Sequence, residues 1–500
     1  MAEGREVAES DGKAGTMGSA LRRAALVAGP AMLALGALLP RPEGLTPEAW
    51  RLLGVTLWMV IWWLSEAVPL AATALVPIAA LPLLQVQPIG TVTAHYGNPL
   101  IFLFLGGFLL AAAMQRWGLH RRIALLILAR IGHTPRGVIW GFALATAFLS
   151  LWISNTATAV MMVAVGASVV DCVESRTADA ATARRFGKAL MLTVAYSASI
   201  GGVGTLIGTP PNALLASLLA ETRGIEIGFF RWMLFGLPIV AVMLPAMHLL
   251  LTRVLFDLSG LDLAPVRKLL REEFRALGPM SRAERRVAVV FALAAASWIF
   301  REALALPITD SGIAILAALA LFALPAGPGD GRVLDWSVAP TLPWGVLLLF
   351  GSGLALAGAF EATGLAQAVA LHAGRLETLP LWALLLVITT GLVFLSEITS
   401  NTASAATLLP VMAAVAAGLG ASVEWLTLPV ALGASLAFML PTGTPPNAIV
   451  FAYKGLTLAD MARAGFWLNL ISIAVITAAV LWLAPLVFDM APPAHLGGIE

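Results

Sequence analysis

Long apolar stretches, interrupted by short polar segments, make up most of this chain. Residues 137–170 carry no charged side chain, and residues 189–220 and 380–453 carry no lysine or arginine. An apolar helix of about 20 residues, rising 1.5 Å per residue, crosses a hydrocarbon core of roughly 30 Å. The apolar stretches suffice for about ten or more such crossings. The pattern therefore predicts an all-α polytopic membrane protein.

Small polar islands lie in the middle of these stretches. One continuous helix over the 34 residues 137–170 would be about 51 Å long, which exceeds the membrane thickness. Its centre reads Ser-Asn-Thr at residues 154–156, so we predict a re-entrant hairpin near 137–173 with this tripeptide at its tip. The same tripeptide at 400–402 predicts a second hairpin near 380–418. Backbone at such tips is tolerated only where protein or a water-filled cavity satisfies its polar groups.

Two identical helix breakers, Gly-Thr-Pro-Pro-Asn, occupy residues 208–212 and 443–447. Proline has no backbone N–H and pushes the residue before it out of helical geometry, so each breaker predicts two half-helices. The carbonyl groups freed at a break suit a hard cation such as Na⁺, and the N–H groups at a helix N-terminus suit an anion. We expect the two tips and the two breaks to meet at one binding site near the membrane midplane.

The second half of the chain repeats the first. Residues 154–157 and 400–403 both read Ser-Asn-Thr-Ala at a separation of 246 residues, and matches at this spacing extend back to Gly107 and Gly353. The Gly-Thr-Pro-Pro-Asn segments are 235 residues apart, and the difference of 11 residues falls on the polar segment 174–188. Self-similarity at a fixed spacing is the sequence signature of a repeated structural unit.

Arginines predict opposite orientations for the two halves. Residues 114–136 contain five arginines, whereas the matching residues 360–382 contain one. Because cytoplasmic loops collect lysine and arginine, we expect the first segment inside and its copy outside. Two similar halves of opposite orientation are typical of secondary transporters. A duplication in a channel or an intramembrane enzyme remains an alternative.

These patterns divide the chain into five segments. We expect a mobile cytoplasmic tail at 1–20, a first transmembrane half at 21–252, a basic cytoplasmic linker at 253–286, an inverted second transmembrane half at 287–490 and a C-terminal tail at 491–500. The first segment is polar and poor in large apolar side chains, which is typical of a segment that cannot form a packed core.

Composition supports this interpretation and excludes several classes of protein. Of the 500 residues, 59% are hydrophobic and only 12% are charged, and the mean hydropathy is +0.90, which is too apolar for a water-soluble domain. The single cysteine, Cys172, excludes an intramolecular disulfide and a cysteine-based metal site, and the six histidines lack metal-binding spacing. The net charge of +2 gives no sign of a nucleic-acid partner. No nucleophile–base pair is visible, so we do not expect an enzyme.

The absence of lysine and arginine from the centres of both halves bears on the substrate. An anion bound there would be held by helix dipoles, hydroxyls, amides and co-bound cations, which favours sodium coupling. A neutral substrate would explain the same absence. Glu397 is the one carboxylate inside a polar island, and an intramembrane acid is a functional candidate by default. We favour a structural hydrogen bond to the hairpin over a proton site.

On these motifs the chain resembles the divalent anion:sodium symporter family, the INDY-like dicarboxylate transporters. The paired Ser-Asn-Thr and Thr-Pro-Pro-Asn motifs carry the resemblance, together with Ser-Glu-Ala-Val-Pro at residues 65–69. The resemblance covers nearly the whole chain. It implies an inverted-repeat elevator transporter, a homodimer with about eleven transmembrane helices and two re-entrant hairpins per protomer, in which a transport domain slides against a dimeric scaffold.

The resemblance also implies roles for individual residues. A first sodium site would use Ser150, Ser154, Asn155 and Gly208. A second sodium site would use Ser396, Thr399, Asn401 and Gly443. The carboxylates of the substrate would meet Asn155, Thr156, Thr209, Asn401, Thr402, Thr444 and Pro445. Thr209, Ser396 and Gly443 depart from the serine, threonine and alanine usual at these positions, so the choice of anion stays open.

Together these inferences predict a sodium-coupled symporter that imports C4-dicarboxylates such as succinate, fumarate or malate across the cell inner (cytoplasmic) membrane. Its expected partners are the small dicarboxylate, sodium ions, the lipid bilayer and a second copy of the chain, with no nucleic acid. We expect no cofactor, and Na⁺ only as the coupling ion. A sodium-independent dicarboxylate exchanger and a sodium symporter for sulfate or citrate are the alternatives.

Overall fold

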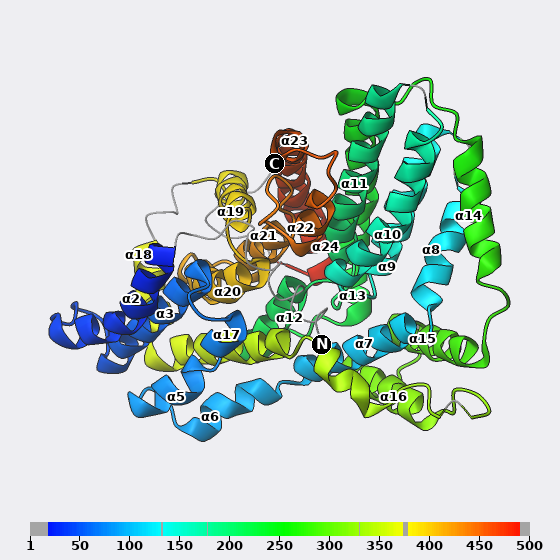
Figure 1. Ribbon diagram of the computed structural model, residues 1–500. Helices are drawn as coiled ribbons and strands as arrows, with labels where there is room; N and C mark the ends of the chain where they lie inside the picture. Colours follow the sequence, from blue (N-terminus) through cyan, green and yellow to red (C-terminus); the bar gives the residue numbers. More distant parts are fainter. Residues whose placement is uncertain (1–18, 132–133, 178, 330, 374–378, 491–500) are drawn as a thin grey trace.

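The fold is built from helices. The computed structural model describes residues 19–131, 134–177, 179–329, 331–373 and 379–490 (Figure 1). Within these ranges the regular structure is helical, with one isolated antiparallel bridge between Pro325 and Arg332. The chain is therefore an all-helical polytopic membrane protein, as its sequence pattern predicts.

The N-terminal region contains a pair of long helices followed by three short ones. These are α2 (Ser19–Leu38), α3 (Pro47–Ser65), α4 (Leu70–Thr73), α5 (Val76–Leu83), α6 (Ile89–Ala94) and the 3₁₀ turn η1 (His95–Gly97). Helix α3 illustrates how the sequence sets a helix start. The Thr46 hydroxyl accepts a hydrogen bond from the Ala49 N–H at 3.0 Å, and Pro47 occupies the first helical position, where its missing N–H costs nothing.

The first repeat contains α7 to α13 and the second contains α17 to α23. The first set is α7 (Pro99–Arg116), α8 (Leu119–Arg130), α9 (Pro135–Ser150), α10 (Asn155–Glu174), α11 (Ala180–Gly202), α12 (Pro210–Arg223) and α13 (Phe229–Leu249), which continues into the π-helix η2 (Leu250–Leu255). The second set is α17 (Trp344–Thr363), α18 (Leu365–Ala373), α19 (Leu381–Ser396), α20 (Asn401–Gly418), α21 (Glu424–Ser435), α22 (Pro445–Phe451) and α23 (Leu458–Ala478), with η5 (Ala479–Leu483) and α24 (Ala484–Phe488) after it.

Corresponding helices of the two sets start at matching positions. Both α9 and α19 have 16 residues, and α10 and α20 begin at the asparagine of each Ser-Asn-Thr motif. Helix α11 has 23 residues whereas α21 has 12. The additional residues of the first repeat therefore extend a helix, and the polar segment 174–188 is mostly the start of α11 rather than a loop.

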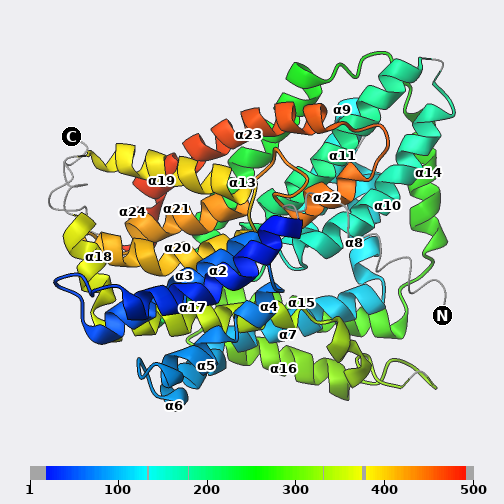
Figure 2. The ribbon, with the colours of Figure 1, turned by 60° about the vertical axis from the view of Figure 1, so that its left-hand side comes forward.

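The two repeats pack into each other at the centre of the molecule. Helix α11 packs against α9 and α10, and α21 packs against α19 and α20. Across the repeats, α10 packs on α22 and α20 packs on α12, so each helical hairpin touches the second half-helix of the other repeat (Figures 1 and 2). Residues 189–202 of α11 are buried throughout. This crossed packing brings the polar islands of both repeats into one region.

Polar contacts at one end of the molecule also join the repeats. The Tyr453 hydroxyl donates to Glu174 Oε1 at 3.0 Å, and Lys188 forms an ion pair with Asp460 at 2.8 Å. Burial, together with the Glu174 carboxylate, raises the pKa of Tyr453 to about 12. The phenol therefore keeps its proton at neutral pH and acts as the donor in this contact.

A further helical segment connects the repeats. It consists of α14 (Ala264–Ala276), α15 (Arg282–Phe300), α16 (Asp310–Ala323) and the 3₁₀ turn η3 (Trp336–Thr341). The expected linker at 253–286 thus includes α14 and the start of α15, because its apolar residues, such as Val266 and Leu270, are buried against the rest of the protein.

The expected tails lie almost entirely outside the described residues. Residues 1–18 and 491–500 are not described, and helix α2 begins at Ser19, inside the tail expected at 1–20.

Six described helices are long and apolar enough by themselves to cross a membrane: Ile89–Arg116, Asn155–Glu174, Phe229–Leu255, Trp344–Thr363, Asn401–Gly418 and Leu458–Phe488. Shorter apolar helices, such as Leu381–Ser396, accompany them. An apolar helix that is paired in a hairpin does not need full membrane length.

Candidate ion and substrate site

The tip of the first hairpin is a four-residue turn between α9 and α10. Helix α9 ends at Ser150 and α10 begins at Asn155, after Ser154, whose hydroxyl accepts a hydrogen bond from the Ala157 N–H at 3.4 Å. The Thr205 hydroxyl, which follows α11, donates to the Leu151 carbonyl at 2.5 Å. The tip is therefore fastened to the break between α11 and α12.

A group of oxygen atoms surrounds the Asn155 carboxamide. One of its terminal atoms lies 2.5 Å from Ser150 Oγ, 3.1 Å from the Ala198 carbonyl oxygen and 3.3 Å from the Gly208 carbonyl oxygen. Nitrogen belongs in this place, because the two N–H groups of the amide then find acceptors among the three oxygens. Ser150 Oγ and the two carbonyl oxygens are of the kind that bind a hard cation, and they would do so together with the amide oxygen if the carboxamide turned.

Two glycines make this arrangement possible. A Cβ on Gly202 would lie 2.5 Å from Asn155 Oδ1, and a Cβ on Gly208 would lie 2.4 Å from the Gly202 carbonyl oxygen. Both distances are far below van der Waals contact, and the second obstacle is backbone. The end of α11 can approach the Asn155 carboxamide this closely, and the break can fold this tightly on itself, only because both residues lack a side chain.

We expect Gly202→Ala to weaken sodium-driven uptake at least about tenfold, because it would displace the Asn155 carboxamide. Gly391→Ala is the matched control: Gly391 lies within α19, and a Cβ there would meet no atom within 4 Å. Alanine should be tolerated there, or stabilise the helix by about 0.5–1 kcal/mol. Uptake assays on both variants test this, and equal activity in the two would contradict the role of Gly202.

The tip of the second hairpin lies between α19 and α20. Ser396 Oγ and Asn401 Oδ1 are buried and have no hydrogen-bond partner in the part of the chain that the structure describes. Thr399 Oγ1 donates to the Leu395 carbonyl at 2.8 Å and lies 2.7 Å from Ser404 Oγ. Two buried oxygens that lack donors are suitable cation ligands.

Glu397 is held by the break of the second repeat. Its carboxylate accepts hydrogen bonds from three backbone N–H groups, those of Phe438, Met439 and Leu440, at 2.7–3.0 Å. It also accepts one from Asn469 Nδ2 at 2.7 Å. A structural hydrogen bond is therefore present, although its partners belong to the break and to α23 rather than to the hairpin. Gly443 leaves room for this carboxylate, since a Cβ there would lie 2.8 Å from Glu397 Oε2.

The half-helices α12 and α22 begin next to the tips. Thr209 and Thr444 are their N-cap residues and are buried, with 3% of each exposed. Two residues that the sequence analysis did not single out, Asn212 and Asn447, hold the breaks in shape. Asn212 Nδ2 donates to the Thr205 carbonyl at 2.8 Å, and Asn447 Nδ2 donates to the Leu440 carbonyl at 3.0 Å. The sequence could have indicated this role, because Asn212 and Asn447 occupy the same position in the two identical Gly-Thr-Pro-Pro-Asn segments.

The structure joins only part of the expected residue sets. Direct contacts connect Ser150, Asn155 and Gly208, whereas Ser154 is exposed and caps α10. Of the expected substrate ligands, the most exposed side chains are Thr156 and Pro445. The remaining site residues lie at the hairpin tips or helix starts, and within the described part of the chain no hydrogen bond joins them to one another: Ser396, Thr399, Asn401, Thr402, Thr209, Thr444 and Gly443. The Ala198 carbonyl oxygen also belongs to the first group, since it accepts a hydrogen bond from Ser150 Oγ. The sequence could not indicate this contact, because it is made by the backbone and not by a side chain.

Comparison with known proteins establishes the family. Residues 20–488 match the sequence profile described as the sodium:sulfate symporter transmembrane region. The chain belongs to this family. The resemblance to the divalent anion:sodium symporters is thereby confirmed, and the chain is a multi-pass membrane transporter rather than an enzyme.

Individual members of the sodium:sulfate symporter family are similar along nearly their whole length. A Staphylococcus saprophyticus protein named sodium-dependent dicarboxylate transporter SdcS is 40% identical over 484 residues, which cover 94% of this chain and 93% of that protein. The SdcS protein of Staphylococcus aureus strain USA300 is 40% identical over 477 residues, covering 93% and 92%. The crystal structure of the Alcanivorax borkumensis YdaH transporter has a TM-score of 0.58 at 16% identity and covers 91% of this chain and 100% of that one. At this identity the likeness shows the fold alone.

Proposed function

We propose that this protein is a sodium-coupled symporter that carries C4-dicarboxylates into the cytoplasm. The observation that carries the proposal is the convergence of Ser150 Oγ and the carbonyl oxygens of Ala198 and Gly208 on the Asn155 carboxamide, a set of ligands suited to Na⁺. Relatives with 40% identity are named sodium-dependent dicarboxylate transporters, which supports both the ion and the anion.

Helix starts supply the complement to a dianion. Helices α10, α12 and α20 begin at the polar islands, and the first N–H groups of a helix carry partial positive charge. No lysine or arginine occurs in residues 137–170, 189–220 or 380–453. Bound sodium ions and helix dipoles would therefore supply the positive field for the two carboxylates, with Asn155, Thr156, Thr209, Asn401, Thr402, Thr444 and Pro445 as the contact residues.

The crossed packing of the repeats supports the transport movement that we propose. Each hairpin packs on the half-helix of the other repeat, which would let the four polar islands move together. We propose an elevator movement of this body in a homodimer in the inner (cytoplasmic) membrane, with sodium binding first and the dianion completing the site. Neutralisation of the substrate charge by sodium would lower the cost of crossing the membrane.

Succinate uptake into proteoliposomes tests the function. An inward sodium gradient should drive uptake at least about tenfold faster than an equal choline gradient, because sodium completes the binding site. Uptake in choline that appears only with dicarboxylate preloaded inside would instead identify an exchanger. Sulfate and citrate, added outside as competitors, should inhibit less than fumarate or malate. Stronger inhibition by sulfate than by fumarate or malate would contradict the proposed substrate class.

A further inference from the structure

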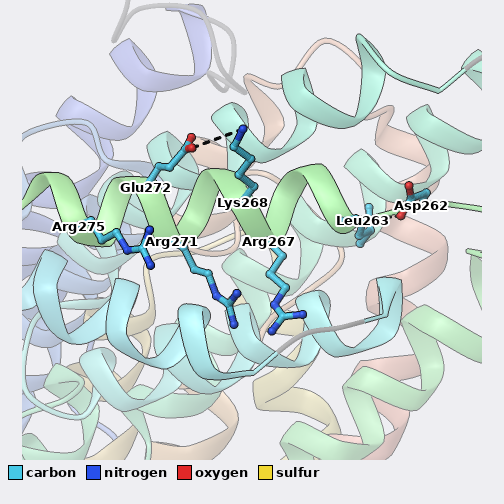
Figure 3. A pocket seen from close by; sticks show the side chains of 8 residues that line it. Asp262, Leu263, Arg267, Lys268, Arg271, Glu272 and Arg275 are labelled. Carbon is cyan, nitrogen blue, oxygen red and sulfur yellow. Dashed lines mark hydrogen bonds and ion pairs between the residues drawn. The ribbon is translucent and has the colours of Figure 1, made fainter.

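A basic pocket runs along α14, and none of its lining residues belongs to the candidate transport site (Figure 3). Its volume is about 450 Å³, and residues of α14 and the two residues before it line it. Arg267, Arg271 and Arg275 follow one another at intervals of four residues, which places them along one side of the helix. Figure 3 shows these arginines extending from one side of α14, whereas Lys268 and Glu272 extend from the opposite side.

The acidic residues of α14 are engaged elsewhere. Glu272 pairs with Lys268 at 3.9 Å, and Glu273 pairs with Arg121 of α8 at 2.7 Å. Asp262, at the start of the pocket, accepts a hydrogen bond from the Ala264 N–H at 2.9 Å. The three pocket arginines are thus left without a carboxylate partner among the residues that the structure describes.

Arg267 has a buried donor without a hydrogen-bond acceptor. Its Nε is buried and has no hydrogen-bond partner within the described residues. A buried donor without an acceptor costs free energy, and more so when it belongs to a charged group. The guanidinium group has a planar set of donors that matches a carboxylate or a phosphate. An anionic group in this pocket would pair with the terminal guanidinium nitrogens of Arg267 and Arg271.

The position of α14 indicates where such an anion comes from. In Figure 2, α14 stands upright at the right-hand edge, transverse to the long helix α17. Helix α14 follows the end of the long α13–η2 helix after a short connection. Its apolar residues Val266 and Leu270 are buried against the protein, so its arginines remain for other contacts. The basic residues of α8 and α14 favour the cytoplasmic side, where the leaflet carries anionic lipids.

We propose that Arg267, Arg271 and Arg275 bind the phosphate of an anionic phospholipid headgroup at the cytoplasmic surface of the membrane. A phosphate diester offers two oxygens to a guanidinium group and forms charge-assisted hydrogen bonds with it. Basic clusters directly next to a membrane helix on the cytoplasmic side are suited to such headgroups. The site is separate from the proposed transport site and does not depend on its substrate.

Titration of the purified full chain with lipid, followed by native mass spectrometry, tests the proposal. Short-chain phosphatidylglycerol should bind the wild type more tightly than phosphatidylcholine does. The triple variant Arg267→Gln/Arg271→Gln/Arg275→Gln should bind phosphatidylglycerol at least about tenfold more weakly. The reason is that each arginine or lysine near an anionic membrane surface strengthens binding to that surface. The double variant Arg271→Gln/Arg275→Gln, which leaves the partly buried Arg267 in place, should lose affinity in the same direction.

A charge-matched control separates this site from general attraction. Arg176→Gln/Arg184→Gln/Arg282→Gln removes the same charge from exposed positions outside α14 and should keep wild-type affinity. Equal losses in the triple variant and the control would overturn the proposal. So would displacement of phosphatidylglycerol by millimolar glycerol 3-phosphate or inorganic phosphate, because a soluble anion would then be the preferred occupant.

Discussion

Asn155→Ala should reduce sodium-driven succinate uptake to background. The variant removes the carboxamide that faces Ser150 Oγ and the carbonyl oxygens of Ala198 and Gly208. Loss of one contact to a charged ligand costs about 1.5–3 kcal/mol, which corresponds to about a 10- to 100-fold rise in the sodium concentration needed for half-maximal uptake. The apparent affinity for succinate should fall as well, because the bound sodium ion supplies part of the positive electrostatic field that holds the dianion.

The measurement is uptake in proteoliposomes as a function of external sodium, with the amount of folded protein checked by size-exclusion chromatography. Ser168→Ala is the matched control, because Ser168 lies on the same helix and its hydroxyl donates to the Ala164 carbonyl, within α10. This control should transport normally. Wild-type sodium dependence in Asn155→Ala would remove Asn155 from the cation site.

Glu397→Gln should lower stability and transport together. The carboxylate accepts hydrogen bonds from three backbone N–H groups at 438–440 and from Asn469 Nδ2. A neutral amide offers a single oxygen acceptor, and its NH₂ group would face donors. We expect a loss of about 2–4 kcal/mol in the free energy of unfolding, because buried donors are left without acceptors. The shape of the break before α22 should be lost in part, and transport with it.

Thermal unfolding in detergent, followed by uptake at several pH values, tests this expectation. Glu361→Gln on α17 is the control, since Glu361 is exposed and its substitution should change stability by no more than about 0.5 kcal/mol. If Glu397 carried a proton during transport, Glu397→Gln would fold normally and would change only the pH dependence of uptake. That outcome would contradict the structural role.

The predicted helices agree with the structure where the signal is local. The Pro-Pro pairs begin α12 and α22, and the Ser-Asn-Thr motifs begin α10 and α20 within a residue of the expected positions. The linker shows the limit of this approach. Its charge predicted a basic linker without indicating secondary structure, whereas in the structure Val266 and Leu270 are buried and α14 packs on α8. The partners of Glu397 lie 41–72 residues away in the chain, and no local pattern indicates them.

The sequence by itself determined that the chain is an all-helical membrane protein with two related halves, because the lengths of the apolar stretches, the helix breakers and the repeated motifs depend only on the order of the residues. It also placed the polar islands. Only the tertiary structure decided which atoms of those islands meet. The approach of Asn155 to the Gly208 and Ala198 carbonyls depends on the glycine-lined crossing of α9, α10 and α11. Carbonyl oxygens belong to every residue, so the sequence cannot show which of them converge, and packing makes that choice.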